Sequence, residues 1–168
     1  MSLKTGWQGR VFEDFEAGDT YRHRLGRTIT QADNIWFTLL TLNSNPIHFD
    51  TALAATTEFG RPLVESTLTL ALVTGLSVSD VSHNGINLGW EDVRLPHPVF
   101  EGDTLYAMSE VLEVRESRSR PTMGIVRVKT TRTNQDGVVV IEFRRTVMVY
   151  RRGHVPDPER PTSPDTTG

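Results

Sequence analysis

The sequence predicts an α+β fold in which a curved antiparallel sheet wraps around one buried helix. Residues 66–78 carry the first observation, because nearly every position there is apolar or small, as in a helix buried all round. The second is that apolar and polar residues alternate with period two in four segments after Asp80. A curved sheet is the economical way to cover such a helix. Because sheets of this kind commonly pair edge to edge, we also expect a dimer.

Two elements are expected before residue 43. Residues 19–27 alternate as a strand, and we expect His23 to be a surface residue of that strand rather than a ligand. Thr30 and Asp33 fit the capping box at the start of a helix. That helix has a broad apolar face, made of Ile35, Phe37, Leu39, Leu40 and Leu42.

Residues 43–50, Asn-Ser-Asn-Pro-Ile-His-Phe-Asp, form a polar loop between helical segments. Pro46 ends regular structure, and Asp50 is a good N-cap for a short helix over residues 51–58. A loop held between rigid elements often carries function, and a His side chain suits proton transfer near neutral pH. From the residues alone, an inert turn and an active-site loop have equal weight. His48 and Asp50 offer only two ligands, which do not make a metal site.

The remaining elements follow in order. Thr74 and Gly75 within the central helix indicate either close approach of a ligand or another backbone, or tight packing of helix on sheet. Asn134 to Gly137 is predicted to form a hairpin turn. The tail from residue 152 is rich in proline and predicted to be disordered, which leaves one domain over residues 1–151. The later strands are expected at residues 85–93, 104–113, 124–132 and 138–150.

Composition excludes several classes of protein. The net charge of -3 gives no general reason to expect a nucleic-acid partner. The chain has no cysteine, which excludes disulfides and thiol chemistry and fits a cytoplasmic location. The longest apolar run, residues 68–73, is too short to span a bilayer, and we see no signal-peptide pattern. We therefore expect a cytoplasmic protein without a membrane partner.

The loop resembles a known motif. Asn43-x-Asn45-Pro46-Ile47-His48-x-Asp50 is similar to the hydratase motif D-x-N-P-[LIV]-H-x-D of the MaoC-like, hotdog-fold (R)-specific enoyl-CoA hydratases. The likeness covers most of residues 10–151 and continues through residues 60–64, 89–94 and 98–105. Within that family it is greatest to the mesaconyl-CoA and itaconyl-CoA hydratase-like branch, on residues 40–50, 66–76 and 115–121.

This resemblance implies a hotdog fold and an activity. It implies addition of water to a short enoyl-CoA, or the reverse dehydration, with a C5 dicarboxylic acyl group in this branch. Coenzyme A would be part of the substrate, and no separate cofactor is expected. The expected assembly is a homodimer or a dimer of dimers. The alternatives are a hotdog acyl-CoA thioesterase and a non-catalytic acyl-CoA-binding module.

The resemblance also assigns roles in the loop. His48 is expected to be the acid and base of the reaction. Asn43 stands where the family has Asp, and an amide can orient water but cannot act as a base. We favour His48 performing both proton transfers while Asn43 orients the water. The alternatives are that Glu65 supplies the missing carboxylate, that a carboxylate of the substrate takes part, or that activity has been lost.

Further residues are expected to bind substrate. The backbone N–H of Ser66, at the start of the central helix, corresponds to the family's donor to the thioester oxygen. Glu65 lies beside it, although a solvent-facing carboxylate at a helix start is the favoured interpretation. Thr74 either contacts the acyl chain or is an ordinary core residue. Arg118 and Arg120 either hold a substrate carboxylate or CoA phosphate, or belong to a solvated hairpin.

Overall fold

The computed structural model describes residue 4 and residues 6–157. The helices are α1 (Gln31–Thr41), α2 (Thr51–Ala54) and α3 (Ser66–Ser77). The strands are β1 (Thr20–Thr28), β2 (Gly85–Arg94), β3 (Thr104–Glu116), β4 (Met123–Thr133) and β5 (Val139–Tyr150). Within these described residues, no helix has the length and apolarity needed to cross a membrane. Most of the tail predicted to be disordered, residues 158–168, lies outside the described residues.

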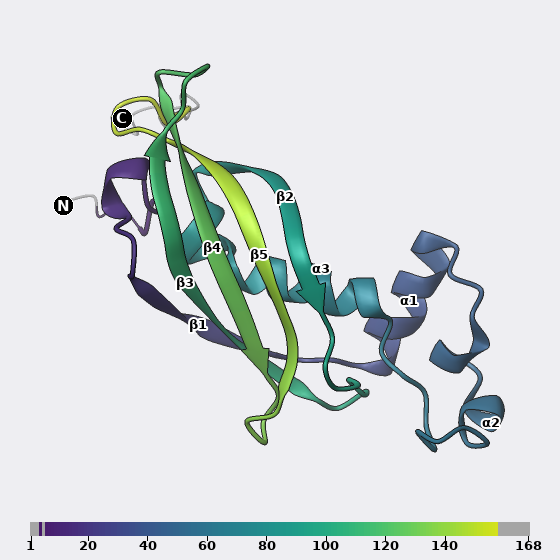
Figure 1. The fold of residues 1–168 in the computed structure, drawn as a ribbon. Helices are drawn as coiled ribbons and strands as arrows, with labels where there is room; N and C mark the ends of the chain where they lie inside the picture. The colour runs from purple at the N-terminus through teal and green to yellow at the C-terminus, as the bar shows by residue number, and fades with distance from the viewer. Residues whose placement is uncertain (1–3, 5, 158–168) are drawn as a thin grey trace, which may run out of the picture.

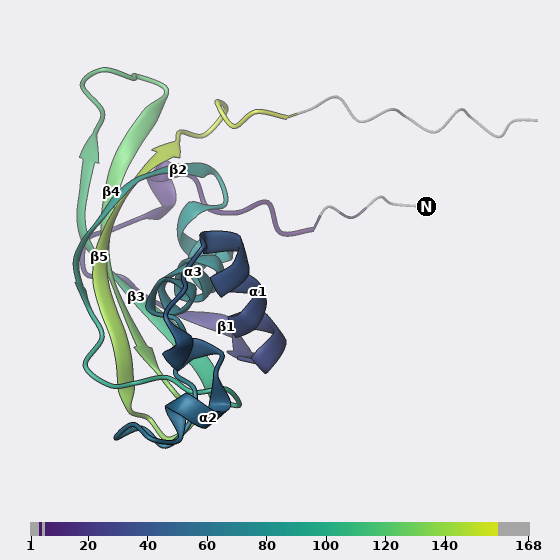
Figure 2. The ribbon, with the colours of Figure 1, turned by 90° about the vertical axis from the view of Figure 1, so that its right-hand side faces the viewer.

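The five strands form one antiparallel sheet in the order β1-β3-β4-β5-β2 (Figure 1). The sheet curves around α3, which lies on its concave side, while α1 and α2 lie beyond the first turn of α3 (Figures 1 and 2). The α+β fold predicted from the sequence is therefore confirmed. Each predicted strand is present, with ends that differ from the expected ones by at most three residues.

The core fills the space between the concave face of the sheet and α3. Alternate residues of β4 and β5 face this space, because side chains in a strand point to opposite sides in turn. Leu68 and Val73 of α3 are almost completely buried in one cluster, whose strand residues come from β3 and β5. Each such side chain contributes roughly 1.5–3 kcal/mol by leaving water. The other buried members of the cluster are Ile29, Val64, Val99, Leu105, Val140, Ile141 and Phe143.

Helix α1 begins at the predicted capping box, where Thr30 and Asp33 exchange hydrogen bonds. Its buried positions, however, are the polar residues Asn34 and Thr38. The predicted apolar face points mainly away from the core, with Leu39, Leu40 and Leu42 exposed at 65%, 77% and 89%. Apolar side chains gathered on one outward helix face are typical of a surface that another protein covers.

Helix α2 is shorter than predicted. Asp50 caps it as expected, since the carboxylate accepts a hydrogen bond from Leu53 N–H at 3.0 Å. The helix ends at Ala54, where the hydroxyl groups of Thr56 and Thr57 donate to the backbone carbonyls of Leu53 and Ala54. Side chains of this kind compete with helical hydrogen bonding, which explains the early end.

The prediction that His23 lies at the surface is wrong. Its side chain points into the concave side of the sheet and is buried. Nδ1 lies 2.9 Å from Asp80 Oδ2, and Nε2 lies 2.8 Å from Ser109 Oγ. Burial lowers the pKa of His23, and the neighbouring carboxylate only partly opposes this. We therefore assign a neutral ring that donates to Asp80, which Arg10 also binds at 2.8 Å.

Candidate active site

The predicted loop is a tight turn built by its own polar side chains. Helix α1 is followed by its C-cap Leu42, whose φ of 56° turns the chain sharply, and Asn43 N–H donates to the Thr38 carbonyl at 2.9 Å. Asn45 then caps a single 3₁₀ turn, Pro46–His48, by accepting from Ile47 N–H at 3.2 Å. Proline suits the first position of such a turn because its fixed φ is helical and no N–H is needed there. The turn delivers His48 to the protein interior, where it is 8% exposed.

The imidazole of His48 is held in one orientation. Its Nδ1 lies 3.0 Å from the backbone carbonyl oxygen of Leu63. A carbonyl can only accept, so we assign the ring proton to Nδ1 from this partner. Nε2 is then left with a lone pair, as a general base requires.

Asn34 joins the loop to the segment that leads into α3. Its Nδ2 donates to the carbonyls of His48 and Leu63, each at 2.9 Å, and its Oδ1 accepts from Glu65 N–H at 2.9 Å. The side chain is fully buried. Asn34 is not among the site residues predicted from the sequence. The available signal was that Asn34 and Thr38 lie four residues apart and therefore share one face of an otherwise apolar helix.

Glu65 is buried at the start of α3, so the expectation that it faces solvent is wrong. Its carboxylate accepts from Leu68 N–H at 2.8 Å and from Thr67 Oγ1 at 2.6 Å, and it is 7% exposed. The carboxylate therefore caps the helix. The N–H groups of Ser66 and Thr67 have no acceptor within the helix, because the first N–H groups of any helix lack one. They carry the partial positive charge of the helix start.

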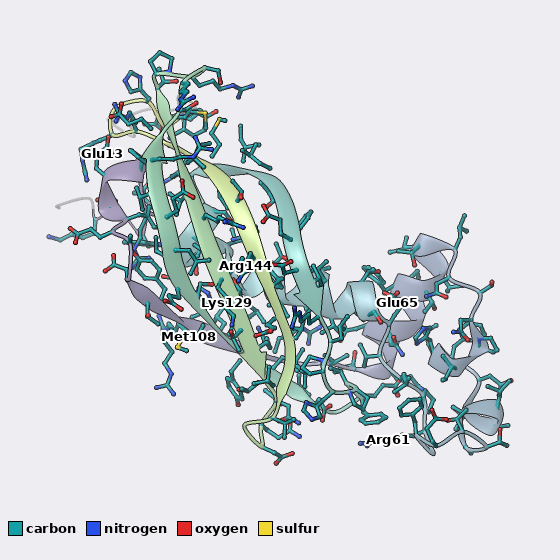
Figure 3. The ribbon with its side chains drawn as sticks, in the orientation of Figure 1. Glu13, Arg61, Glu65, Met108, Lys129 and Arg144 are labelled. Atoms are coloured by element: carbon teal, nitrogen blue, oxygen red, sulfur yellow. The ribbon has the colours of Figure 1, made fainter. Side chains whose placement is uncertain are left out.

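Asn43 contacts Glu65 across the site. Its Nδ2 lies 3.3 Å from Glu65 Oε1, and its Oδ1 accepts from Asn45 N–H at 3.1 Å. Figure 3 shows Glu65 where α3 begins, next to α1. The structure thus brings together four of the predicted site residues, which are Asn43, His48, Glu65 and Ser66.

An open, mostly apolar cavity of about 510 Å³ adjoins this cluster. Asn43 lies at its wall, so the cavity reaches the polar groups of the loop. Its other lining residues are Ile35, Thr38, Leu39, Leu42, Ser44 and Phe49. A concave apolar surface with a few polar groups at one side is the usual form of a small-molecule site.

Comparison with known proteins identifies the family of the chain. The model of the mesaconyl-CoA hydratase family matches residues 2–165. The chain belongs to the mesaconyl-CoA hydratase family. It is 37% identical to the beta-methylmalyl-CoA dehydratase of Chloroflexus aurantiacus, over 99% of this chain and 48% of that protein. It is 34% identical to the mesaconyl-CoA hydratase of Cereibacter sphaeroides, over 95% of this chain and 47% of that protein. The chain thus spans about half the length of these relatives.

The chain is also similar to solved structures, which bear on its fold. A MaoC-like dehydratase from Rhodospirillum rubrum matches with a TM-score of 0.75 and 28% identity, over 86% of this chain and 99% of that one. A protein of Mycobacterium tuberculosis with a double hotdog fold matches with a TM-score of 0.78 and 22% identity, over 93% of this chain and 47% of that one. The predicted hotdog fold is therefore confirmed.

The three other residues predicted to bind substrate lie apart from the cluster around His48. Thr74 is eight residues after Ser66 on α3, about 12 Å along the helix, and its hydroxyl accepts from Trp90 Nε1 at 3.2 Å. Arg118 and Arg120 lie in the turn between β3 and β4, at the end of the sheet away from α1 (Figure 1). The fold of one chain therefore does not bring these residues to His48.

Proposed function

We propose that this protein catalyses hydration of the 2,3-double bond of a short, carboxylated enoyl-CoA, or the reverse dehydration. The observation that carries the proposal is the ring of His48. Its Nδ1 is held by the Leu63 carbonyl, three residues before the start of α3, which leaves Nε2 free for proton transfer. A basic nitrogen beside a helix start is the pairing that water addition to an enoyl thioester needs.

The chemistry follows from these groups. Nε2 of His48 takes a proton from water as the water oxygen bonds to C3. Negative charge then moves to the thioester oxygen, where the N–H of Ser66 donates a hydrogen bond and the partial charge of the helix start stabilises the enolate. The imidazolium returns the proton to C2. One N–H of Asn43 is engaged by Glu65, and its second N–H orients the water.

The family supports a dicarboxylic C5 acyl group as substrate. The relatives are named as hydratases and dehydratases of mesaconyl-CoA and beta-methylmalyl-CoA. In this proposal Thr74 contacts bound substrate, and Arg118 or Arg120 holds the substrate carboxylate or a CoA phosphate. A guanidinium is suited to both groups because it binds them through two parallel hydrogen bonds.

A homodimer would provide those contacts. Strand β2 lies at the edge of the sheet and carries exposed apolar side chains, and the exposed face of α3 carries the small residues Ala71 and Gly75. Pairing of two β2 edges by a two-fold axis places opposite ends of the two sheets side by side. The hairpin with Arg118 and Arg120 would then lie toward the partner's site. The exposed apolar residues of β2 are Ile86, Leu88, Trp90 and Val93.

The test is incubation of the protein with mesaconyl-CoA, itaconyl-CoA and crotonyl-CoA. Loss of enoyl absorbance without release of free thiol is the expected result, with the greatest rate for a carboxylated ester. Release of free thiol would instead identify a thioesterase, and binding without either change would identify an acyl-CoA-binding module. Either of those two outcomes would overturn the proposal.

A further inference from the structure

The chain has an amide, Asn43, where the hydratase motif has a carboxylate, and that amide contacts the carboxylate of Glu65. We propose that Glu65 is a second catalytic group, which binds the attacking water together with His48, and that Asn43 holds Glu65 in place. This inference rests on the proposed function and adds a residue to that same site. It makes the loop and the start of α3 one catalytic unit.

The hydrogen bonds of Asn43 point to this division of roles. Its Oδ1 already accepts from Asn45 N–H at 3.1 Å, and its Nδ2 donates to Glu65 Oε1 at 3.3 Å. An amide has no proton to exchange near neutral pH, so Asn43 cannot take the part of an acid or a base. The side chain is instead oriented to hold a carboxylate.

Glu65 retains room for one more donor. An ionised carboxylate offers about four acceptor positions. Oε2 receives Leu68 N–H and Thr67 Oγ1, whereas within the described part of the chain Oε1 receives only Asn43 Nδ2. The free position is therefore on Oε1, the oxygen nearer to the catalytic loop. A water bound there would be held beside Asn43, the first residue of the motif.

Glu65 also has an unusual length for its structural role. Short side chains, which are Ser, Thr, Asp and Asn, are the preferred N-caps. This chain follows that preference at α1 with Thr30 and at α2 with Asp50. At α3 the cap is Glu65, whose additional methylene lets one oxygen cap the helix while the other reaches Asn43. A cap alone does not require that reach.

One side chain places the two proposed catalytic residues together. Asn34 binds the backbone carbonyl of His48 and the backbone N–H of Glu65, both at 2.9 Å. Nδ1 of His48 binds the carbonyl of Leu63, only two residues before Glu65. Both side chains are buried, at 8% and 7% exposure. The imidazole and the carboxylate are thus fixed to the same short segment of backbone.

The step balances without any further reactant. One hydrogen of the water is transferred to His48 Nε2 as the C3–O bond forms, and the other remains on the oxygen in a hydrogen bond to Glu65 Oε1. The carboxylate stabilises the imidazolium that forms and neither takes up nor releases a proton in the step. The imidazolium then transfers its proton to C2, which restores the neutral ring and completes the alcohol.

Two substitutions separate catalysis by Glu65 from capping by Glu65. Glu65→Asp keeps a charged and well-suited N-cap but withdraws the carboxylate by one methylene from Asn43 and the water. Glu65→Gln keeps the reach but removes the charge. We expect kcat to fall about 10²-fold in each, because displacement by about 1 Å and loss of a charge that stabilises the transition state both have effects of this order. KM is expected to remain within about threefold, since the residue acts on water and not on the bound ester.

A third variant restores the carboxylate from the other side. In Asn43→Asp/Glu65→Gln the carboxylate and the amide exchange places, and their hydrogen bond is kept. We expect kcat about tenfold above that of Glu65→Gln alone, a typical coupling between residues in direct contact. Asp33→Asn, which changes the cap of α1 outside the site, is the matched control and should keep the wild-type kcat.

The outcomes distinguish this inference from the proposed function. If the wild-type protein hydrates none of the enoyl-CoA esters, the proposed function fails. If the wild type is active and Glu65→Asp, folded by circular dichroism, keeps kcat within threefold, Glu65 is a cap only and the inference is overturned. A double variant no faster than Glu65→Gln would overturn it as well.

Discussion

The side-chain amide of Asn43 donates a hydrogen bond to the buried carboxylate of Glu65 over a distance of 3.3 Å. This contact joins the first residue of the hydratase motif to the cap of α3, 22 positions later in the chain. It accounts for the departure from the family pattern at position 43. An Asp there would place two carboxylates in contact, where like charges repel.

The first prediction concerns that repulsion. Asn43→Asp should lower the free energy of unfolding at pH 8 by roughly 1–3 kcal/mol, equivalent to a rise of one to two units in the pKa of one carboxyl of the pair. Because a raised carboxyl pKa favours the folded state only when the proton is bound, the loss should be smaller at pH 5. Urea denaturation at both pH values measures the difference. Equal losses at pH 5 and pH 8 would show that the two side chains are not in contact.

The second prediction concerns His48. His48→Gln should reduce the hydration rate about 10³-fold, because the amide of Gln cannot accept and return a proton as the imidazole does through its Nε2. The acyl-CoA should still bind, which isothermal titration calorimetry can establish. The matched control is His97→Gln, since the exposed His97 likewise contacts a backbone carbonyl, that of Val139 at 2.8 Å, but lies outside the site. Retained activity in His48→Gln would remove this residue from the mechanism.

The third prediction concerns Asn34. Asn34→Asp has the same shape but loses the two N–H groups that bind the carbonyls of His48 and Leu63. A buried carboxylate would then face two carbonyl oxygens, and we expect the free energy of unfolding to fall by about 2–4 kcal/mol. The value of kcat/KM should fall too, since both backbone segments carry catalytic groups. A variant with wild-type stability would contradict the assigned hydrogen bonds.

The fourth prediction concerns the buried His23. Burial lowers its pKa below 6.5, so the unfolded chain takes up a proton at a pH where the folded ring stays neutral. Stability should therefore fall as the pH decreases below about 6.5, by up to about 1.4 kcal/mol per pH unit. For Asp80, burial acts to raise the pKa, but hydrogen bonds from His23 and Arg10 outweigh it and lower the pKa, so its effect appears only in stronger acid.

Urea denaturation between pH 7.5 and 5.5 measures this dependence. His23→Gln should have a smaller slope of stability against pH over that window, because the titrating ring is absent. His97→Gln should keep the wild-type slope, because His97 is exposed. If His23→Gln retains the full wild-type slope, another group is responsible for it.

The fifth prediction concerns the exposed face of α3. Beyond the chain neighbours and helix backbone of Gly75 itself, no atom of the described residues lies within 4 Å of a Cβ added there, so Gly75→Gln meets no obstacle from the rest of the fold. Replacing a helical glycine should stabilise the single chain by up to about 1 kcal/mol. In the proposed homodimer the added side chain would meet the partner, and the dimer should dissociate. Sedimentation analysis of both proteins tests this, and a variant that keeps the wild-type mass would place the interface elsewhere.

Several features of this protein could be derived from local pattern. The strands, the cap of α1 and the cap of α2 follow from period-two alternation and from short polar side chains at helix starts. These features depend on residues a few positions apart in the sequence, so local pattern is enough to predict them.

The lengths of the helices were less predictable. Helix α2 ends early because the hydroxyl groups of Thr56 and Thr57 donate to backbone carbonyls. Helix propensity does not predict whether a threonine side chain makes such a bond or leaves the helix intact.

The sequence by itself determined that a buried small-residue helix is surrounded by antiparallel strands, and that a polar loop with His48 precedes it. Only the tertiary structure decided which polar groups meet. The contact of Glu65 with Asn43, the three hydrogen bonds of Asn34 and the inward orientation of His23 all depend on partners at least 14 residues away. The physical reason is that a polar side chain is buried only where a distant donor or acceptor compensates it, and chain order does not reveal that partner.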